Sequence, residues 1–337
     1  MEYRKIKQLT PEEWNDLSYD LKRLHIDYTK HIYRTYVKFS TEKLDILVSF
    51  TGEFKHIATP GNIASQFSQQ VKFHKITEGY GRREVKTLNG KTKVIWDYAG
   101  NNGYQYADEY YANKELKCWS YDISSAYAFA MLNPMPDTTK EPRYNDRVRK
   151  NEMGFYKNGK ATTVEGSYAD IIFPLMDSPF KDWVYKYYKK KVDTEKIEDE
   201  KLRKIERQKW KDYLNIPQGL LQRYNIFLRN AILYYNNIYI RKYTDENTVY
   251  VNTDSIVSLV PRSDIPLGDE IGQFKLSKEN VSFKYKDVGI FQWKNDCHYK
   301  GIPGSCISDI SDTEGWLDNF EYRMEGDLVV KNEKKKR

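Results

Sequence analysis

Apolar and aromatic residues recur at helical spacing in three stretches of the chain. The first covers residues 10–39, where Thr10 and Pro11 have the residue types of a helix start and two acids follow in the first turn. The second, residues 180–213, is dense in lysine, glutamate and tyrosine. The third, residues 220–236, places several apolar side chains on or near one face. This spacing predicts three helices over these ranges.

Short apolar runs bounded by turn residues predict the strands. Residues 79–104 carry repeated glycines and Asn-Gly pairs, so we expect hairpins and turns there. Residues 117–123 predict a short strand that passes into a helix over 124–132 and stops at Asn133-Pro134. Residues 248–260 predict a β-hairpin with a tight polar turn. The remaining expectations are a loop over 52–66, a polar and irregular segment over 136–168, and a buried strand over 169–176.

Two acids stand at the ends of predicted strands. Asp254 lies at the tip of the predicted hairpin, and Asp122 ends a strand just before a helix begins. A helix start can cradle a phosphate while a neighbouring acid holds a cation. Two such acids suit a pair of divalent ions, which activate an attacking hydroxyl and neutralise a leaving pyrophosphate. Taken alone, Asp122 could merely cap its helix and Asp254 could merely shape its turn.

Composition narrows the class of protein. The 337 residues hold 39% apolar residues, enough for a core, and Lys plus Arg exceed Asp plus Glu by seven (55 minus 48). A moderately basic chain with 29 tyrosines suits a polyanionic partner, although codon bias also explains the tyrosines. Three cysteines argue against a disulfide scaffold and fit a reducing cytoplasm. We expect no membrane span and no signal peptide, because no apolar run is long enough.

Motif order adds a resemblance to the family B DNA polymerases. Tyr121-Asp-Ile-Ser-Ser-Ala-Tyr127 resembles the first polymerase motif, D-x-x-S-L-Y-P, and Tyr250-Val-Asn-Thr-Asp-Ser255 resembles the third, Y-x-D-T-D-S. Between them, Lys211-Asp-Tyr-Leu-Asn-Ile-Pro-Gln-Gly219 is similar to the second, K-x-x-x-N-S-x-Y-G. Tyr98-Ala-Gly-Asn-Asn-Gly103 resembles the template-binding Y-x-G-G turn. The likeness covers most of residues 95–305 and points to the protein-primed phage subgroup.

The resemblance implies roles for these residues. Asp122, Asp254 and the main chain of Ile123 would hold two Mg²⁺ or Mn²⁺ ions, and the two acids would be catalytic. Tyr127 would lie under the incoming sugar and exclude a 2′-hydroxyl. The expected nucleotide-binding residues are Ile123, Ser124, Ser125, Tyr127, Arg207, Lys211 and Asn215. The expected DNA-binding residues are Tyr98, Gly100, Gly103, Gly219, Thr253, Lys294, His298 and Lys300.

The sequence also departs from the family pattern. Asn252 stands where the family has an acid, so one negative charge is missing beside the metals and we expect altered metal dependence. Ile216 and Gln218 replace a serine and a tyrosine in the second motif. The spacing between motifs looks too short for the insertions that grip a terminal protein and encircle DNA. Asp20 resembles an acid of the third exonuclease motif, but the partner acids have no room, so we expect no proofreading in cis.

The predicted fold is α+β, a right-hand polymerase core. We expect an exonuclease-remnant helical region over 1–75, a palm over 76–180 and 236–300, fingers over 181–235, and a small thumb with a basic tail over 301–337. The expected activity is template-directed extension of a primer, with primer-template DNA and dNTPs as partners and a separate exonuclease subunit or processivity factor as further candidates. We expect a cytoplasmic location in a bacterial host, encoded by a phage, plasmid or other mobile element. A non-catalytic DNA-binding subunit and a primase-polymerase that starts chains de novo stay open.

Overall fold

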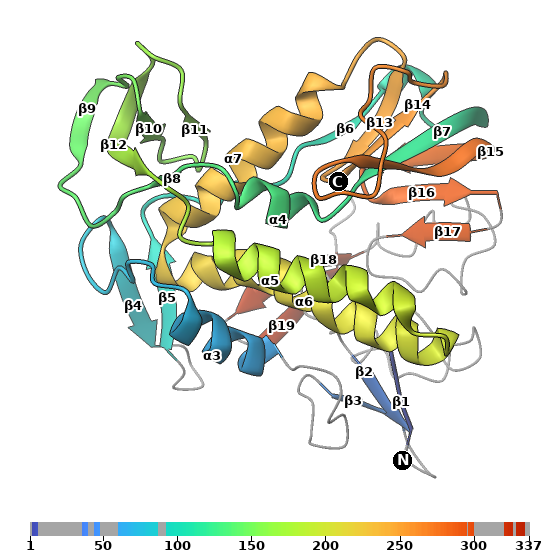
Figure 1. The fold of residues 1–337 in the computed structure, drawn as a ribbon, viewed down its shortest axis with the longest axis horizontal. Coiled ribbons are helices and arrows are strands. Elements are labelled where there is room, and N and C mark those ends of the chain that lie inside the picture. The colour runs from blue at the N-terminus through green and yellow to red at the C-terminus, as the bar shows by residue number, and fades with distance from the viewer. Residues whose placement is uncertain are drawn as a thin grey trace.

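The computed structural model describes residues 2–5, 36–39, 44–47, 60–86, 92–294, 296–299, 320–325 and 328–333. Within these ranges the chain is a mixed fold of helices and antiparallel sheets, which confirms the expected α+β class (Figure 1). Most of the helix predicted over 10–39 lies outside the described residues, as do Asp20 and Lys300. Its last four residues, Tyr36–Phe39, form strand β2 instead, and three of the four are β-branched or aromatic residues, which favour strands.

The largest sheet of the described chain has seven strands and carries both candidate acids. Its order is β17 (Asp296–Tyr299), β16 (Ile290–Trp293), β15 (Phe274–Asp287), β7 (Leu116–Ile123), β14 (Ser255–Ser258), β13 (Thr248–Asn252) and β6 (Gln105–Ala107). Each of its strand pairs is antiparallel. The strand predicted over 117–123 is therefore confirmed, as is the hairpin predicted over 248–260, whose second strand ends at Ser258.

Alternation along β7 decides which face of this sheet Asp122 occupies. Tyr121 and Ile123 pack with Ile240 and Tyr243 at the end of helix α7 (Ile226–Lys242). Asp122 lies between them in sequence, so its side chain points to the opposite face, because successive side chains of a strand alternate. The acid is thus on the face that α7 leaves uncovered.

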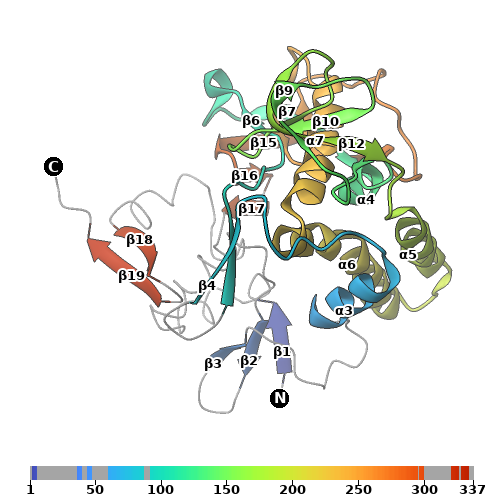
Figure 2. The same ribbon diagram turned by 90° about the vertical axis from the view of Figure 1, so that its left-hand side faces the viewer.

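Four further helices accompany α7: α3 (Pro60–Gln70), α4 (Ala126–Ala130), α5 (Lys181–Asp193) and α6 (Glu200–Tyr224). Figures 1 and 2 both show α5 and α6 side by side, and the rings of Tyr187 and Tyr213 stack between them at 4.4 Å. The helix predicted over 180–213 is wrong as one piece, because a short 3-10 turn (Thr194–Lys196) interrupts it. The predicted boundary at 213–220 is also wrong, since α6 continues to Tyr224.

Two capping side chains explain these boundaries. Asp199 accepts a hydrogen bond from the amide of Leu202 at 2.8 Å and starts α6. Asn225 accepts one from the amide of Leu228 at 3.1 Å and starts α7. A side chain that caps a helix start satisfies an amide left without a partner, so these two residues set the helix ends.

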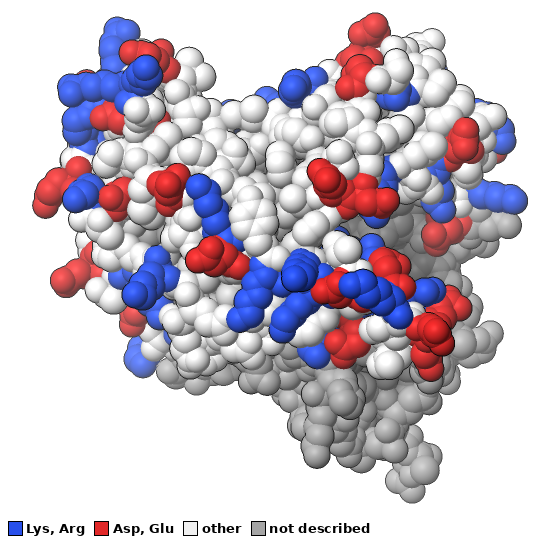
Figure 3. Space-filling model, in the orientation of Figure 1, with Lys and Arg blue, Asp and Glu red and all other residues white. Residues whose placement is uncertain are grey.

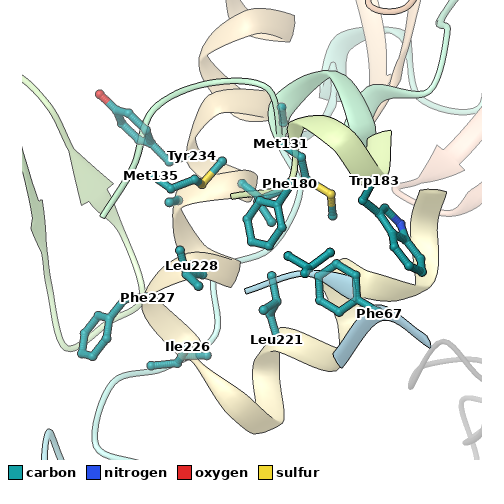
Figure 4. Packing of buried hydrophobic residues seen from close by; sticks show 14 of the residues in the cluster. Phe67, Met131, Met135, Phe180, Trp183, Leu221, Ile226, Phe227, Leu228 and Tyr234 are labelled. Atoms are coloured by element: carbon teal, nitrogen blue, oxygen red, sulfur yellow. The ribbon is translucent and has the colours of Figure 1, made fainter. Parts of the chain in front are cut away.

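The main core lies where α3, α4, α5, α6 and α7 meet, and Figure 4 shows its side chains. Phe67 packs edge-on against Trp183 at 5.2 Å, and Phe227 is fully buried. The loop predicted over 52–66 is wrong from residue 60 onward, because α3 begins there. Pro60 suits a first helical position, and Ile63 and Phe67 fall one turn apart on the buried side.

A second sheet fills the segment predicted to be irregular. Strands β8 (Met135–Pro136), β9 (Arg143–Arg147), β10 (Glu152–Phe155), β11 (Ala161–Thr162) and β12 (Tyr168–Met176) pair around β12. The prediction for 136–168 is therefore wrong, because cross-strand pairing stabilises polar strands that have little apolar pattern of their own. The buried strand over 169–176 is confirmed.

Smaller elements complete the described chain. The expected hairpin near Asn89-Gly90 is confirmed by β4 (Arg82–Lys86) and β5 (Thr92–Trp96). A 3-10 turn (Glu109–Tyr111) precedes β7. The three-stranded sheet of β1 (Glu2–Lys5), β2 and β3 (Leu44–Leu47) and the hairpin of β18 (Phe320–Glu325) and β19 (Leu328–Glu333) lie near the two ends of the chain. Among the described residues, no helix is long and apolar enough to cross a membrane.

Candidate active site

Sheet pairing brings Asp122 and Asp254 together. Ser255, the residue after Asp254, is the cross-strand partner of Asp122. The amide of Ile123, the residue after Asp122, donates a hydrogen bond to the carbonyl of Asp254 at 2.7 Å. The two acids are more than one hundred positions apart in sequence, so only this register makes them neighbours.

The electrostatics of the pair show that the carboxylates sense each other. The pKa of Asp254 is raised to about 6, first by the surrounding protein and then by the negative charge of Asp122, while the charge of Lys211 opposes the rise. Burial also raises the pKa of Asp122, against a hydrogen bond from Ser277 and the charges of Lys211 and Lys278. The side chain of Asp254 is nevertheless exposed at the hairpin tip, so an ion in solution can reach it. Two like charges held close favour a cation between them.

The hairpin tip is held in a strained backbone conformation. Thr253 has a φ of +63°, which is rare for a β-branched residue. Its amide donates to the carbonyl of Tyr104 at 2.8 Å, and its carbonyl accepts from the side chain of Asn236 at 2.8 Å. Strained residues persist where their surroundings over-determine them, and they cluster at functional sites. The position of Asp254 is therefore fixed from both sides.

A polar row on α7 anchors the segment from Ala99 to Tyr104 beside that tip. The Arg229 guanidinium donates to the carbonyl of Asn101 at 2.9 Å, and Asn230 bonds the backbone of Ala99 and Asn101. Asn237 bonds Asn102 and Tyr104 in the same way. Sequence reasoning missed this row. Its only signal was an Arg-Asn pair inside a helix otherwise patterned for burial.

Arg229 of this row is a buried cation. It is 8% exposed, its Nε has no hydrogen-bond partner, and no ion pair in the described part of the chain includes it. Burial lowers its pKa, and the nearby hydroxyl of Tyr127 partly offsets this. Tyr127 in turn has its pKa raised to about 12, by burial and by Asp254. Tyr127 is thus within electrostatic range of Asp254 and of Arg229.

The resemblance implies that the backbone of Ile123 and Ser124, at the end of β7, binds the triphosphate, but the structure bonds both amides within the protein. The amide of Ile123 donates to Asp254, and the amide of Ser124 donates to the carbonyl of Gln273 at 2.8 Å. Both amides assigned to a triphosphate are therefore already engaged within the protein. Ser125, which has a φ of +57°, instead receives a hydrogen bond on its Oγ from Nζ of Lys191 at 2.7 Å.

Lys191 is a site residue that sequence reasoning missed. It is 8% exposed, and burial together with the charges of Arg207, Lys211 and Lys275 lowers its pKa to about 8. Figure 3 shows basic side chains gathered over α5, the helix that carries it. Arg207 and Lys275 have acid partners, whereas no ion pair among the described residues includes Lys191 or Lys211. Two such lysines close together are a setting for a polyanion. Nothing in the run Lys189-Lys190-Lys191 marks the third lysine in advance.

The residues of α6 that were expected to bind nucleotide or DNA differ in their surroundings. Lys211 is exposed, and its positive charge lowers the pKa of both Asp122 and Asp254. We therefore count it with the candidate site. Arg207 forms an ion pair with Glu195, so part of its donor set is occupied. A side chain added at Gly219 would meet nothing within 4 Å, so the helix is open at this point. Asn215, one turn before Gly219, is half-buried.

Asn252 lines a cavity with Asp122. The cavity has a volume of about 180 Å³, and its wall includes Ser277, Lys278 and Trp293. The side-chain oxygen of Asn252 accepts a hydrogen bond from Gln105 at 3.1 Å. The neutral amide is thus fixed beside the acid, at the position where the family pattern has a second carboxylate.

Two residues expected to bind DNA lie away from the acids, and a third lies against a wall of the Asp122 cavity. Tyr98 is buried in the core against Phe227 at 5.1 Å. Lys294 lines a second cavity, of about 450 Å³, with Ser282 and Glu115. Ser282 pairs with Lys117, whose side chain points to the face opposite to that of Asp122. His298 stacks at 4.7 Å on Phe291, which lines the same cavity as Asp122.

The residues present fit a divalent cation in part. Two carboxylates with substrate phosphates and water are a usual Mg²⁺ environment. The described residues include no group of three or more His, Cys, Asp or Glu side chains suited to a metal on its own. An ion here would therefore depend on oxygens from a substrate as well as on Asp122 and Asp254.

Comparison with known proteins gives partial structural likenesses. No protein-family model and no curated protein sequence matches the chain. Phi29 DNA polymerase complexed with primer-template DNA and incoming nucleotide substrates is 13% identical over 70% of this chain and 60% of that one, at a TM-score of 0.46. An orthorhombic crystal form of Phi29 DNA polymerase is 14% identical, over 59% and 49%, at 0.44.

A more distant likeness is to the family B DNA polymerase from the hyperthermophilic archaeon Pyrobaculum calidifontis. It is 12% identical over 69% of this chain and 30% of that one, at a TM-score of 0.36. The chain thus spans less than two thirds of the length of each of these polymerases. The chemistry of the site rests on its own residues.

Proposed function

We propose that the chain is a template-directed DNA polymerase that extends a primer by nucleotidyl transfer. The observation that carries the proposal is the meeting of Asp122 and Asp254 on adjacent strands, next to Lys211 and the buried Lys191. Paired acids can hold divalent ions, and a group of cations can hold a polyphosphate. Together they suit a reaction in which the ions act on a bound polyphosphate. The order of the three motifs in the sequence supports the same reaction.

Each part of the site has a proposed task. Asp122, Asp254 and the carbonyl of Ile123 would hold two Mg²⁺ or Mn²⁺ ions, which activate the primer hydroxyl and neutralise the leaving pyrophosphate when bound. Lys211 and Lys191 would bind the triphosphate. Tyr127 would lie against the sugar, because it lies beside Asp254.

The DNA contacts are proposed on the two sides of this centre. Gly100, Gly103 and Thr253, which α7 holds together, would face the template strand. Asn215 and Gly219 would face the nascent base pair, where the open surface of α6 gives room. In this reading the seven-stranded sheet is the palm, and α5 and α6 form the fingers.

Primer extension tests the proposal. A labelled primer on a longer template should be extended with dNTPs and Mg²⁺ or Mn²⁺ by the natural chain, and extension should fall by at least about 10³-fold in Asp122→Asn and Asp254→Asn. Glu165→Gln, which changes an exposed acid in the turn before β12, is the matched control and should extend normally. Equal extension by the acid variants would show that another site or a contaminant does the chemistry.

A second function has one observation in its favour. Asn252 removes a charge from the site, which suits a DNA-binding subunit without catalysis. That reading predicts binding of primer-template DNA with no extension in either metal. An unprimed template with labelled nucleotides separates a further alternative, since only a primase-polymerase would give product there.

A further inference from the structure

Helix α5 contacts the large sheet region through two side chains, one helical turn apart. The hydroxyl of Tyr188 donates a hydrogen bond to the carbonyl of Asp269 at 2.6 Å. Nζ of Lys191 donates to Oγ of Ser125 at 2.7 Å and lies 5.4 Å from the centre of the Tyr188 ring. Tyr188 therefore supports the lysine with its ring while its hydroxyl is tied to another segment.

The two contacts end on one connected piece of backbone. The amide of Ser124 donates to the carbonyl of Gln273, and the amide of Gly272 donates to the carbonyl of Ser124 at 2.9 Å. Tyr239 of α7 adds a hydrogen bond to the carbonyl of Gly272 at 2.8 Å. The loop from residue 266 to 273 is thus fastened to the turn that carries Ser125. Asp269 and Ser125 offer α5 two fixed points.

Lys191 needs such an anchor because its neighbours repel it. Its pKa is lowered by the positive charges of Arg207, Lys211 and Lys275. No ion pair among the described residues includes Lys191. The carboxylate of Asp269 pairs with Lys275 at 2.5 Å, and the Asp269 carbonyl accepts the hydrogen bond from α5. The ring of Tyr188 attracts the ammonium group, and the hydroxyl keeps that ring in place.

We propose that Tyr188 is a positioning residue, which holds Lys191 at the triphosphate side of the acid pair. This inference rests on the proposed function, because it gives Lys191 its ligand. Tyr188 would touch neither the nucleotide nor the metal ions. It would act by setting where α5 and its lysine stand relative to Ser125.

Tyr188→Phe is the direct test, because it removes the hydroxyl and keeps the ring. Tyr185→Phe is the matched control, since Tyr185 lies one turn earlier on α5 and is 56% exposed. Loss of one hydrogen bond should raise the KM for dNTP in primer extension by roughly 3- to 10-fold. The kcat at saturating dNTP should stay unchanged in both variants, and the control should keep its KM.

A double variant separates positioning from a general weakening of the fold. In a Lys191→Met background, Tyr188→Phe should add no further change in KM, because the group that it places is gone. The same pattern should appear in calorimetric binding of inorganic tripolyphosphate, which needs no catalysis. If tripolyphosphate binds Tyr188→Phe and Tyr185→Phe equally well, or if Tyr188→Phe acts fully without Lys191, the inference is overturned.

The binding measurement also keeps the two proposals apart. A natural chain that fails to extend primers refutes the polymerase function. The tripolyphosphate comparison still decides the role of Tyr188 in that case. A natural chain that extends primers, with a Tyr188→Phe variant indistinguishable from the control, refutes the inference alone.

Discussion

Gly103 packs against the hairpin tip that carries Asp254, so alanine at this position should move that tip. A Cβ at residue 103 would lie 2.6 Å from both Cγ2 and Oγ1 of Thr253 and 3.0 Å from its Cβ. Carbon atoms in contact sit about 3.5–4.0 Å apart, so one side must yield by roughly 1 Å. Thr253 cannot simply rotate, because a β-branched side chain is stiff and its amide and carbonyl are both bonded.

The displacement would pass directly to Asp254, the next residue. A misplacement of about 1 Å in a catalytic group can cost about 10²-fold in rate. Overpacking of this kind costs about 1–3 kcal/mol in the free energy of unfolding. We therefore expect Gly103→Ala to lower the rate of single-nucleotide primer extension by roughly 100-fold, while the chain stays folded in urea titrations.

Two further variants show whether the hairpin tip is the cause. Thr253→Ala removes both close atoms. The extension rate of Gly103→Ala/Thr253→Ala relative to Thr253→Ala should therefore be higher than the rate of Gly103→Ala relative to the natural chain. Gly79→Ala controls for stability, since Gly79 has a φ of +76° with nothing within 4 Å and its backbone strain costs about 1–2 kcal/mol. The reasoning fails if Gly103→Ala extends at the natural rate, or if Thr253→Ala brings no relief.

Three other outcomes follow from the same geometry. Without divalent ions, Asp254→Asn should have a higher free energy of unfolding than the natural chain at pH 7. The gain should shrink as the pH falls through about 6, because the folded chain binds the proton of Asp254 more tightly than the unfolded chain does. Urea unfolding in chelator measures the difference between Asp254→Asn and the natural chain at pH 7 and pH 4, and equal differences would contradict the prediction. Asn225→Ala removes the α7 cap and the side-chain bonds to His74 and Thr138, so it should cost about 2–4 kcal/mol, and a loss below about 1 kcal/mol in urea would contradict it. Asn252→Asp adds a carboxylate to the cavity of Asp122 and should lower the half-saturating Mg²⁺ in primer extension several-fold, an effect that an unchanged titration would rule out.

Local pattern was enough for the strands that carry the acids. The run from Lys117 to Ile123 and the hairpin around Thr253-Asp254 are short, apolar and bounded by polar turns, and such signals act over a few residues. Pattern failed where distant contacts decide. The strands within 136–168 depend on pairing with β12, and the ends of α6 and α7 depend on caps at Asp199 and Asn225.

The nucleotide side of the site shows the same limit. Lys211 could be picked out by its motif, and it lies close enough to act on both acids. Arg207 was expected to bind the nucleotide as well, but the 3-10 turn after α5 brings Glu195 into an ion pair with it. Lys191 is the lysine that reaches Ser125, because packing of α5 on α6 turns that one of three consecutive lysines inward.

The sequence by itself determined where the acids stand along the chain, Asp122 near the end of a strand and Asp254 in a hairpin turn. It also determined that the hairpin carries one acid rather than two, since residue 252 is an asparagine. Only the tertiary structure decided that Asp122 and Asp254 meet, because the register of β7 on β14 fixes the spacing of residues more than one hundred positions apart. It alone decided that the amides of Ile123 and Ser124 are already bonded and that a polar row of α7 holds the hairpin tip.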